Sequence, residues 1–127
     1  MMLKSELFKK AYKRKSVLNI TDRNLSKLSN IDIQTISKFL NGSDVELETI
    51  KKIVNILGLD ILGNELIDIQ TLKENRAKER ALYIVGLVQD TSALELQGLE
   101  DKELNLLIEE TKEQFLNGAY QDKLWCS

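Results

Sequence analysis

The sequence DRNLSKLSNIDIQTISKFLNGSDVELETIKKIVNILGL, residues 22–59, carries the strongest structural signal in this chain. Its Leu, Ile, Val and Phe residues recur at three- and four-residue intervals, which is the spacing that places side chains on one face of a helix. This pattern predicts two short helices, over 22–29 and 33–40, joined by a tight turn. A third helix, which ends at Leu57 before Gly58, is expected to pack behind them.

Residues that favour helix ends stand at the boundaries of these segments. Thr21 and Asp32 are suited to cap the two short helices, because their side-chain oxygens accept hydrogen bonds from free backbone N–H groups. Asn30 tolerates the left-handed conformation that ends a helix, and Asn41-Gly42 ends the next one. For the third helix, the side chain of Asp44 or Glu46 is the expected cap.

The second short helix leaves one face polar. The apolar residues Ile36, Phe39 and Leu40 are expected in the core, and the polar face carries Gln34, Ser37, Lys38 and Asn41. Such side chains suit the major groove of DNA, since Gln bonds adenine bidentately, Lys bonds guanine or phosphate, and Ser bonds several bases. The pattern therefore indicates a surface that contacts double-stranded DNA.

The same residues resemble the Xre/Cro family of lambda-repressor-like helix-turn-helix domains over about residues 8–62. The matching pieces are Leu25-Ser26-Lys27-Leu28, Asn30-Ile31-Asp32, Gln34-Thr35-Ile36-Ser37-Lys38, Leu40-Asn41-Gly42, and the apolar positions from Leu47 to Leu59. The resemblance implies an all-α chain, with a helix-turn-helix domain of about five helices followed by a helical C-terminal extension. It implies domains at 1–65, which binds DNA, and at 66–127, which dimerises or binds a partner.

The resemblance also implies roles by position. Four residues fall where the recognition helix meets base edges: Ile33, Gln34, Ser37 and Lys38. Four fall where contacts with the DNA backbone are expected: Arg23, Lys27, Thr35 and Asn41.

The sequence departs from the family pattern at Ser26, where the family prefers Ala, and at Asn30, where it prefers Gly, but both residues suit the fold. Two further positions leave a contact open. Asp22 stands where many members have a Gln that contacts phosphate, so that contact is in doubt here. Ile33 either contacts a thymine methyl group or is simply half-buried.

The rest of the chain also indicates helix. It contains no proline, which would interrupt helices, and few aromatic residues. Apolar spacing predicts helices over 2–15, 71–96 and 101–117, whereas the apolar run in 59–72 fits a helix or a strand equally well. The aromatic tail, with Tyr120, Leu124 and Trp125, is expected to pack against another part of the protein.

The net charge of −2 conceals an asymmetry. Residues 1–41 carry nine Lys or Arg against three Asp or Glu, and residues 63–127 carry seven against thirteen. A basic first half and an acidic second half fit a DNA-binding surface and a separate partner surface, although chance distribution over solvated helices gives the same pattern.

Several function classes are not supported by the composition. The chain has no histidine and one cysteine, Cys126, so it offers no zinc site of these ligands and no internal disulfide. No phosphate-binding glycine loop or nucleophile–base pair is present, and we expect neither an enzyme nor a cofactor. We expect no membrane segment, and the absence of export features indicates a cytoplasmic protein.

Together these features predict a dimeric transcriptional regulator, a repressor of its own operon, that binds a palindromic operator through the major groove. Residues 63–127 are too few to form a secure core alone, so a second copy of the chain is the first candidate partner. The alternative is an antitoxin-type protein whose acidic C-terminal half binds and neutralises a toxin. The residues alone leave both interpretations open.

Overall fold

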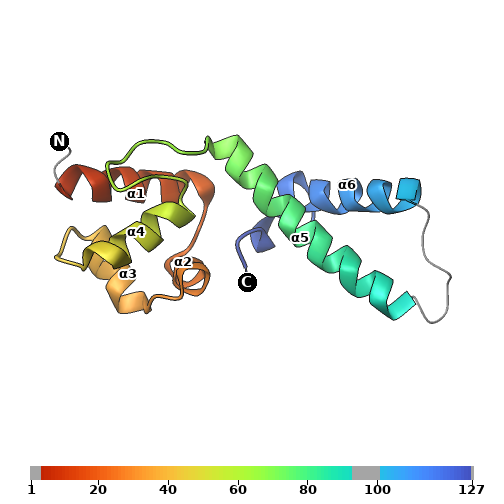
Figure 1. The fold of residues 1–127 in the computed structure, drawn as a ribbon, viewed down its shortest axis with the longest axis horizontal. Helices are drawn as coiled ribbons and strands as arrows, with labels where there is room; N and C mark the ends of the chain where they lie inside the picture. The colour runs from red at the N-terminus through yellow and green to blue at the C-terminus, as the bar shows by residue number, and fades with distance from the viewer. Residues whose placement is uncertain (1–3, 93–100, 127) are drawn as a thin grey trace. The chain divides into compact units, whose positions relative to one another are not determined.

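The computed structural model describes residues 4–92 and 101–126, and in this part of the chain the regular elements are all helices, joined by turns and loops, without a strand. Its elements are α1 (Lys4–Leu18), α2 (Asp22–Ser29), α3 (Ile33–Leu40), α4 (Leu47–Ile56), α5 (Ile69–Ser92), α6 (Asp101–Asn117) and a short 3-10 helix η1 (Gln121–Lys123), shown in Figure 1. The predicted all-α fold is confirmed, and α2, α3 and α6 have the predicted bounds. The predicted end of the long helix, residues 93–96, lies outside the described residues.

The chain divides into two compact units. The first contains the residues up to Leu72 together with those from Trp125 onward, and the second contains Lys73–Leu124. The division falls somewhat after the boundary at residue 65 that the sequence suggested.

The first unit is built around α1 to α4. In it α3 packs against α1 and α2, and α2 also packs against α4. The fully buried side chains include those of Leu18, Leu25, Ile36, Phe39, Ile53, Val54 and Leu57. These are the apolar positions of the helical pattern, so the core forms because each helix turns its apolar face inward.

Helix caps fix the ends of α2 and α3. The Thr21 hydroxyl accepts a hydrogen bond from the Asn24 N–H at 3.0 Å, and Asn30 ends α2 in the left-handed conformation with φ of 58°. Asp32 caps α3, and these three predictions are confirmed. Glu46, one of the two expected caps of α4, occupies the cap position without a side-chain capping hydrogen bond.

Gly42 ends α3 at a φ of +82°, a conformation that favours glycine. A Cβ atom at this position would lie 2.8 Å from Cε1 of Phe8 on α1. The glycine therefore allows the chain to turn out of α3 directly against α1.

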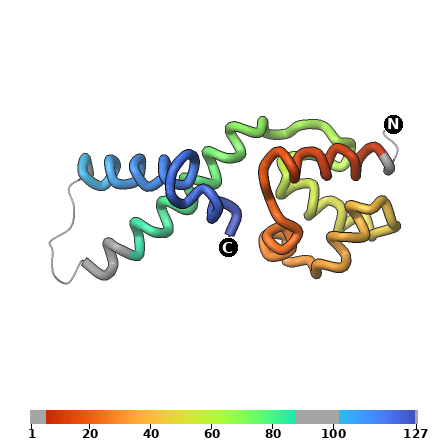
Figure 2. The backbone as a smooth tube through the Cα atoms, turned by 180° about the vertical axis from the view of Figure 1, so that it is seen from behind, coloured from red at the N-terminus to blue at the C-terminus, as the bar shows by residue number. Residues whose placement is uncertain are grey.

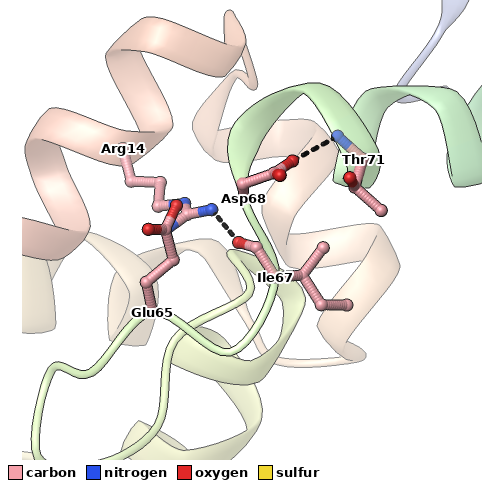
Figure 3. A network of polar contacts seen from close by, with 5 residues as sticks. All are labelled: Arg14, Glu65, Ile67, Asp68 and Thr71. Carbon is pink, nitrogen blue, oxygen red and sulfur yellow. Dashed lines mark hydrogen bonds and ion pairs between the residues drawn. The ribbon is translucent and has the colours of Figure 1, made fainter.

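Of the run 59–72, the last four residues begin α5, and the segment between α4 and α5 is neither a helix nor a strand. It is a loop with one isolated antiparallel bridge, between Leu59 and Glu65, and the Gly58 carbonyl accepts a hydrogen bond from Leu66 N–H at 2.8 Å. The Arg14 guanidinium on α1 fastens this loop, because it donates to the Ile67 carbonyl and forms an ion pair with Glu65 at 3.2 Å (Figure 3).

Asp68 then begins α5 by accepting a hydrogen bond from the Thr71 N–H at 2.6 Å, which is also drawn in Figure 3. Hydrogen bonds from the Thr71 side chain and backbone lower the pKa of the Asp68 carboxyl.

The second unit is formed by α5, α6 and η1. Both views show α6 crossing α5 (Figures 1 and 2). The Arg80 guanidinium on α5 lies 5.4 Å from the centre of the Phe115 ring on α6. Phe115 is buried and also contacts the Tyr120 ring. The Arg76 side chain donates to the Leu124 carbonyl at 2.9 Å, which fixes the end of η1.

The residues after η1 return to the first unit. Trp125 is only 6% exposed, and its indole N–H donates to the Leu18 carbonyl at 2.8 Å. Leu18 is the last residue of α1, so its carbonyl has no partner within the helix. The tail thus supplies the missing donor, which gives the predicted packing of the aromatic tail a specific partner.

Candidate nucleic-acid interface

The candidate interface is built on the turn between α2 and α3. After Asn30 the chain passes through Ile31, whose carbonyl accepts a hydrogen bond from the Ser26 hydroxyl. Asp32 follows as the cap of α3 and accepts hydrogen bonds from Thr35 N–H at 3.1 Å and from the Thr35 hydroxyl at 2.7 Å. These contacts fix the angle at which α3 leaves the turn.

The Asp32 carboxylate is held in its charged form. The hydrogen bonds from the Thr35 side chain and backbone lower the pKa of this carboxyl below its ordinary value, and the positive charge of Lys38 contributes in the same direction. The same hydrogen bonds that cap α3 therefore favour the charged form of the carboxylate.

One side of α3 is buried and the other is open to solvent. Ile36, Phe39 and Leu40 lie in the core. The exposed face of α3, as we call it below, consists of Ile33, Gln34, Ser37, Lys38 and Asn41. Residues four apart on a helix are neighbours, so this face contains two rows, Ile33–Ser37–Asn41 and Gln34–Lys38.

The polar groups of the exposed face are available to a ligand. Within the described part of the chain, the side chains of Gln34, Ser37 and Lys38 take part in no hydrogen bond or ion pair. Ile33 is 44% exposed, so a large part of its side chain is open to solvent. The four residues predicted to contact bases thus share one accessible surface.

The residues predicted to contact the DNA backbone differ in their surroundings. Arg23 and Lys27 are exposed on α2, and Asn41 is exposed after the last turn of α3. Thr35 is half-buried and its hydroxyl is bonded to Asp32, so in this structure it serves the cap of its own helix.

Asp22, which stands where many members of the family have Gln, is paired within the protein. Its carboxylate forms an ion pair with Lys15 at 2.9 Å. The pair partly neutralises a negative charge at the start of α2, where it would otherwise repel phosphate.

Arg14 is a buried cation on α1. Arg14 is 7% exposed and binds the loop before α5, so its charge is used within the protein. The sequence contained the signal, because Arg14 continues the helical spacing of Leu7, Ala11 and Leu18 and so lies on the buried face of α1. Lys9, Lys10 and Lys13 are exposed.

The described residues contain no group of three or more His, Cys, Asp or Glu side chains placed to hold a metal ion. None of the described helices has an apolar stretch long enough to cross a lipid bilayer.

Comparison with known proteins gives one result. Residues 11–63 match the family model for helix-turn-helix domains, and no curated protein or solved structure matches the chain significantly. The family is one of DNA-binding domains and not of enzymes. The matched residues contain α2, the turn, α3 and α4, which the structure arranges around one core. Residues 11–63 are therefore a helix-turn-helix domain of the lambda-repressor-like, Xre type.

Proposed function

We propose that this protein is a sequence-specific DNA-binding transcriptional regulator, which acts as a dimeric repressor of its own operon. The observation that carries the proposal is the exposed face of α3, where unpaired Gln34, Ser37 and Lys38 side chains stand on a rigid, capped helix. In the proposed complex α3 lies in the major groove, and the side chains of this face contact base edges.

Contacts with the DNA backbone position the helix. Arg23 and Lys27 are exposed cations on α2, the helix that precedes the turn, and we assign them to phosphate binding together with Asn41. For Thr35, the proposed backbone contact requires that the hydroxyl turns its single proton from Asp32 to a phosphate oxygen, while the Thr35 N–H keeps its hydrogen bond to the Asp32 carboxylate. Phosphate contacts of this kind give affinity that falls with salt and does not depend on sequence.

A second copy of the chain would contact the second half of a palindromic DNA site. One helix-turn-helix module makes few base contacts, and dimers place two recognition helices about 34–36 Å apart on a palindromic site. The second unit has large apolar side chains on its surface, with Leu82, Tyr83 and Leu87 on α5 and Leu106 on α6 all more than two-fifths exposed. We propose that this apolar surface of the second unit forms the dimer interface.

The dimer is tested by sedimentation equilibrium of the protein and of a Tyr83→Glu variant. The proposal predicts a dimer for the unmodified protein and a shift toward monomer for the variant, since a charge in an apolar interface is costly. A Lys78→Glu change on the same helix, at an exposed polar position, is the control. A monomeric unmodified protein would contradict dimerisation and would favour the antitoxin-type function, in which the apolar surface binds a different protein.

DNA recognition is tested by fluorescence anisotropy with a duplex from upstream of the gene and with a shuffled duplex of the same composition, at two salt concentrations. We expect preference for the upstream duplex, and we expect Lys38→Ala to weaken binding by about 1–3 kcal/mol while relaxing base preference. Lys52→Ala, which removes the same charge from an exposed position on α4, is the matched control.

The outcomes of this experiment separate specific from electrostatic binding. Equal binding to both duplexes, weakened by salt and indifferent to Lys38→Ala, would mean that the protein only attracts polyanions. If Lys38→Ala loses the same amount of affinity for every duplex sequence, Lys38 contacts a phosphate and not a base.

A further inference from the structure

The exposed face of α3 contains one residue whose chemistry differs from the rest. Ile33 is the first residue of α3, and 44% of its surface is open to solvent. The other four residues of this face are polar, and Ile33 lies in the same row as Ser37 and Asn41. An apolar group thus stands in the surface that we propose to meet DNA.

The position of Ile33 is fixed by its neighbours. Asp32 caps the helix through Thr35, so the first turn of α3 has a defined backbone, and a β-branched side chain has few rotamers there. Ile36, one turn along, is fully buried and anchors the same turn in the core. The Ile33 side chain is therefore held as a rigid apolar projection beside Gln34.

In the major groove only one of the four bases presents an apolar group, which is the methyl group of thymine. We infer that Ile33 recognises a thymine methyl group, so that each operator half-site carries a T·A pair opposite the first turn of α3. This inference rests on the proposed function, since it specifies the base that the proposed DNA-binding face selects. It also agrees with the chemistry of Gln34 next to it, whose amide pairs best with adenine.

The test uses the substitution of deoxyuridine for thymidine, which removes the methyl group and leaves base pairing unchanged. A half-site is first selected from random duplexes with the full-length protein, and each selected T is then replaced in turn by U. We expect one position at which U weakens binding by about fourfold, which is the effect of burying one methyl group.

Variants connect that position to Ile33. In Ile33→Ala the preference for T over U at this position is expected to vanish, whereas Leu62→Ala, at another exposed apolar residue of the first unit, keeps it. Ile33→Ala is expected to keep the fold and most of the stability of the unmodified protein, because 44% of the Ile33 surface is open to solvent and the buried Ile36 anchors the same turn. A merely structural role of Ile33 would change stability and leave the ratio of T to U affinity intact.

The outcomes distinguish this inference from the proposed function. A selected half-site at which every T tolerates U, or a T preference that survives in Ile33→Ala, overturns the inference and leaves sequence-specific binding standing. If selection enriches no sequence at all, the proposed function fails and the inference falls with it.

Discussion

The tail residue Trp125 offers a sharp test of how the first unit is stabilised. Its indole ring is buried, and its N–H satisfies the carbonyl at the end of α1, on Leu18. In Trp125→Ala the large side chain and the hydrogen bond are both lost, and buried Trp-to-Ala changes cost about 3–5 kcal/mol. Small domains are stable by about 5–15 kcal/mol in total, so the first unit would lose a large share of its stability.

Trp125→Phe separates the two contributions. It keeps most of the apolar ring and removes the donor, so the buried Leu18 carbonyl loses its partner, at a cost of about 1–3 kcal/mol. The expected order of stability is therefore unmodified protein, then Trp125→Phe, then Trp125→Ala.

Urea unfolding measured by circular dichroism gives these differences. Trp125 is the only tryptophan, so its fluorescence in the unmodified protein reports on the first unit alone and identifies which part of the dichroism transition belongs to that unit. Tyr12→Ala, at an exposed aromatic residue of α1, is the control and should change stability by no more than about 0.5 kcal/mol. Unfolding of Trp125→Ala at the same urea concentration as the unmodified protein would refute the assignment of the tail to this unit.

Three further predictions concern the framework of the helix-turn-helix domain. Arg14→Ala should lower the free energy of unfolding by about 1.5–3 kcal/mol in urea, because the loop before α5 loses a charged hydrogen-bond donor; an unchanged midpoint would contradict this. Asp32 has a folded-state pKa lowered by Thr35, so its contribution to stability is present above about pH 4 and is lost as pH falls through the folded pKa. Asp32→Asn keeps a capping oxygen but does not titrate, so between pH 5 and pH 2 its free energy of unfolding should fall less steeply than that of the unmodified protein. The same slope in both proteins would count against the capping role of Asp32. Gly42→Ala should destabilise the domain by more than about 1 kcal/mol, measured by thermal unfolding, since φ is positive and a Cβ meets the ring of Phe8; a neutral effect would mean that the ring moves aside freely.

The features of the fold that depend on neighbours in sequence were predictable. The caps at Thr21 and Asp32 and the left-handed turn at Asn30 are local hydrogen-bonding and steric effects, so residue type and position were sufficient. The apolar spacing of α2 to α4 was sufficient for the core for the same reason.

The features that depend on distant contacts were not predictable. The loop before α5 has an apolar pattern that fits two structures, and its course is set by Arg14, far away in the sequence. The packing partner of Trp125 lies at the other end of the chain and no local pattern identifies it.

For the candidate interface, the residues exposed on α3 were predictable from the sequence, but the side-chain hydrogen bonds and ion pairs around them were not. The pairing of Asp22 with Lys15 and of Thr35 with Asp32 depends on side-chain geometry between elements or within a single turn. The roles assigned to bases and phosphates therefore stay predictions, which the structure makes specific enough to test.

The central claim is that the exposed face of α3 meets DNA. The most direct measurement is the change in amide chemical shifts of the isotope-labelled protein on titration with the selected half-site duplex. We expect the largest changes at residues 33–41, with smaller ones around Arg23 and Lys27 on α2. Changes confined to α5 and α6, or none at a duplex concentration that saturates binding, would contradict it.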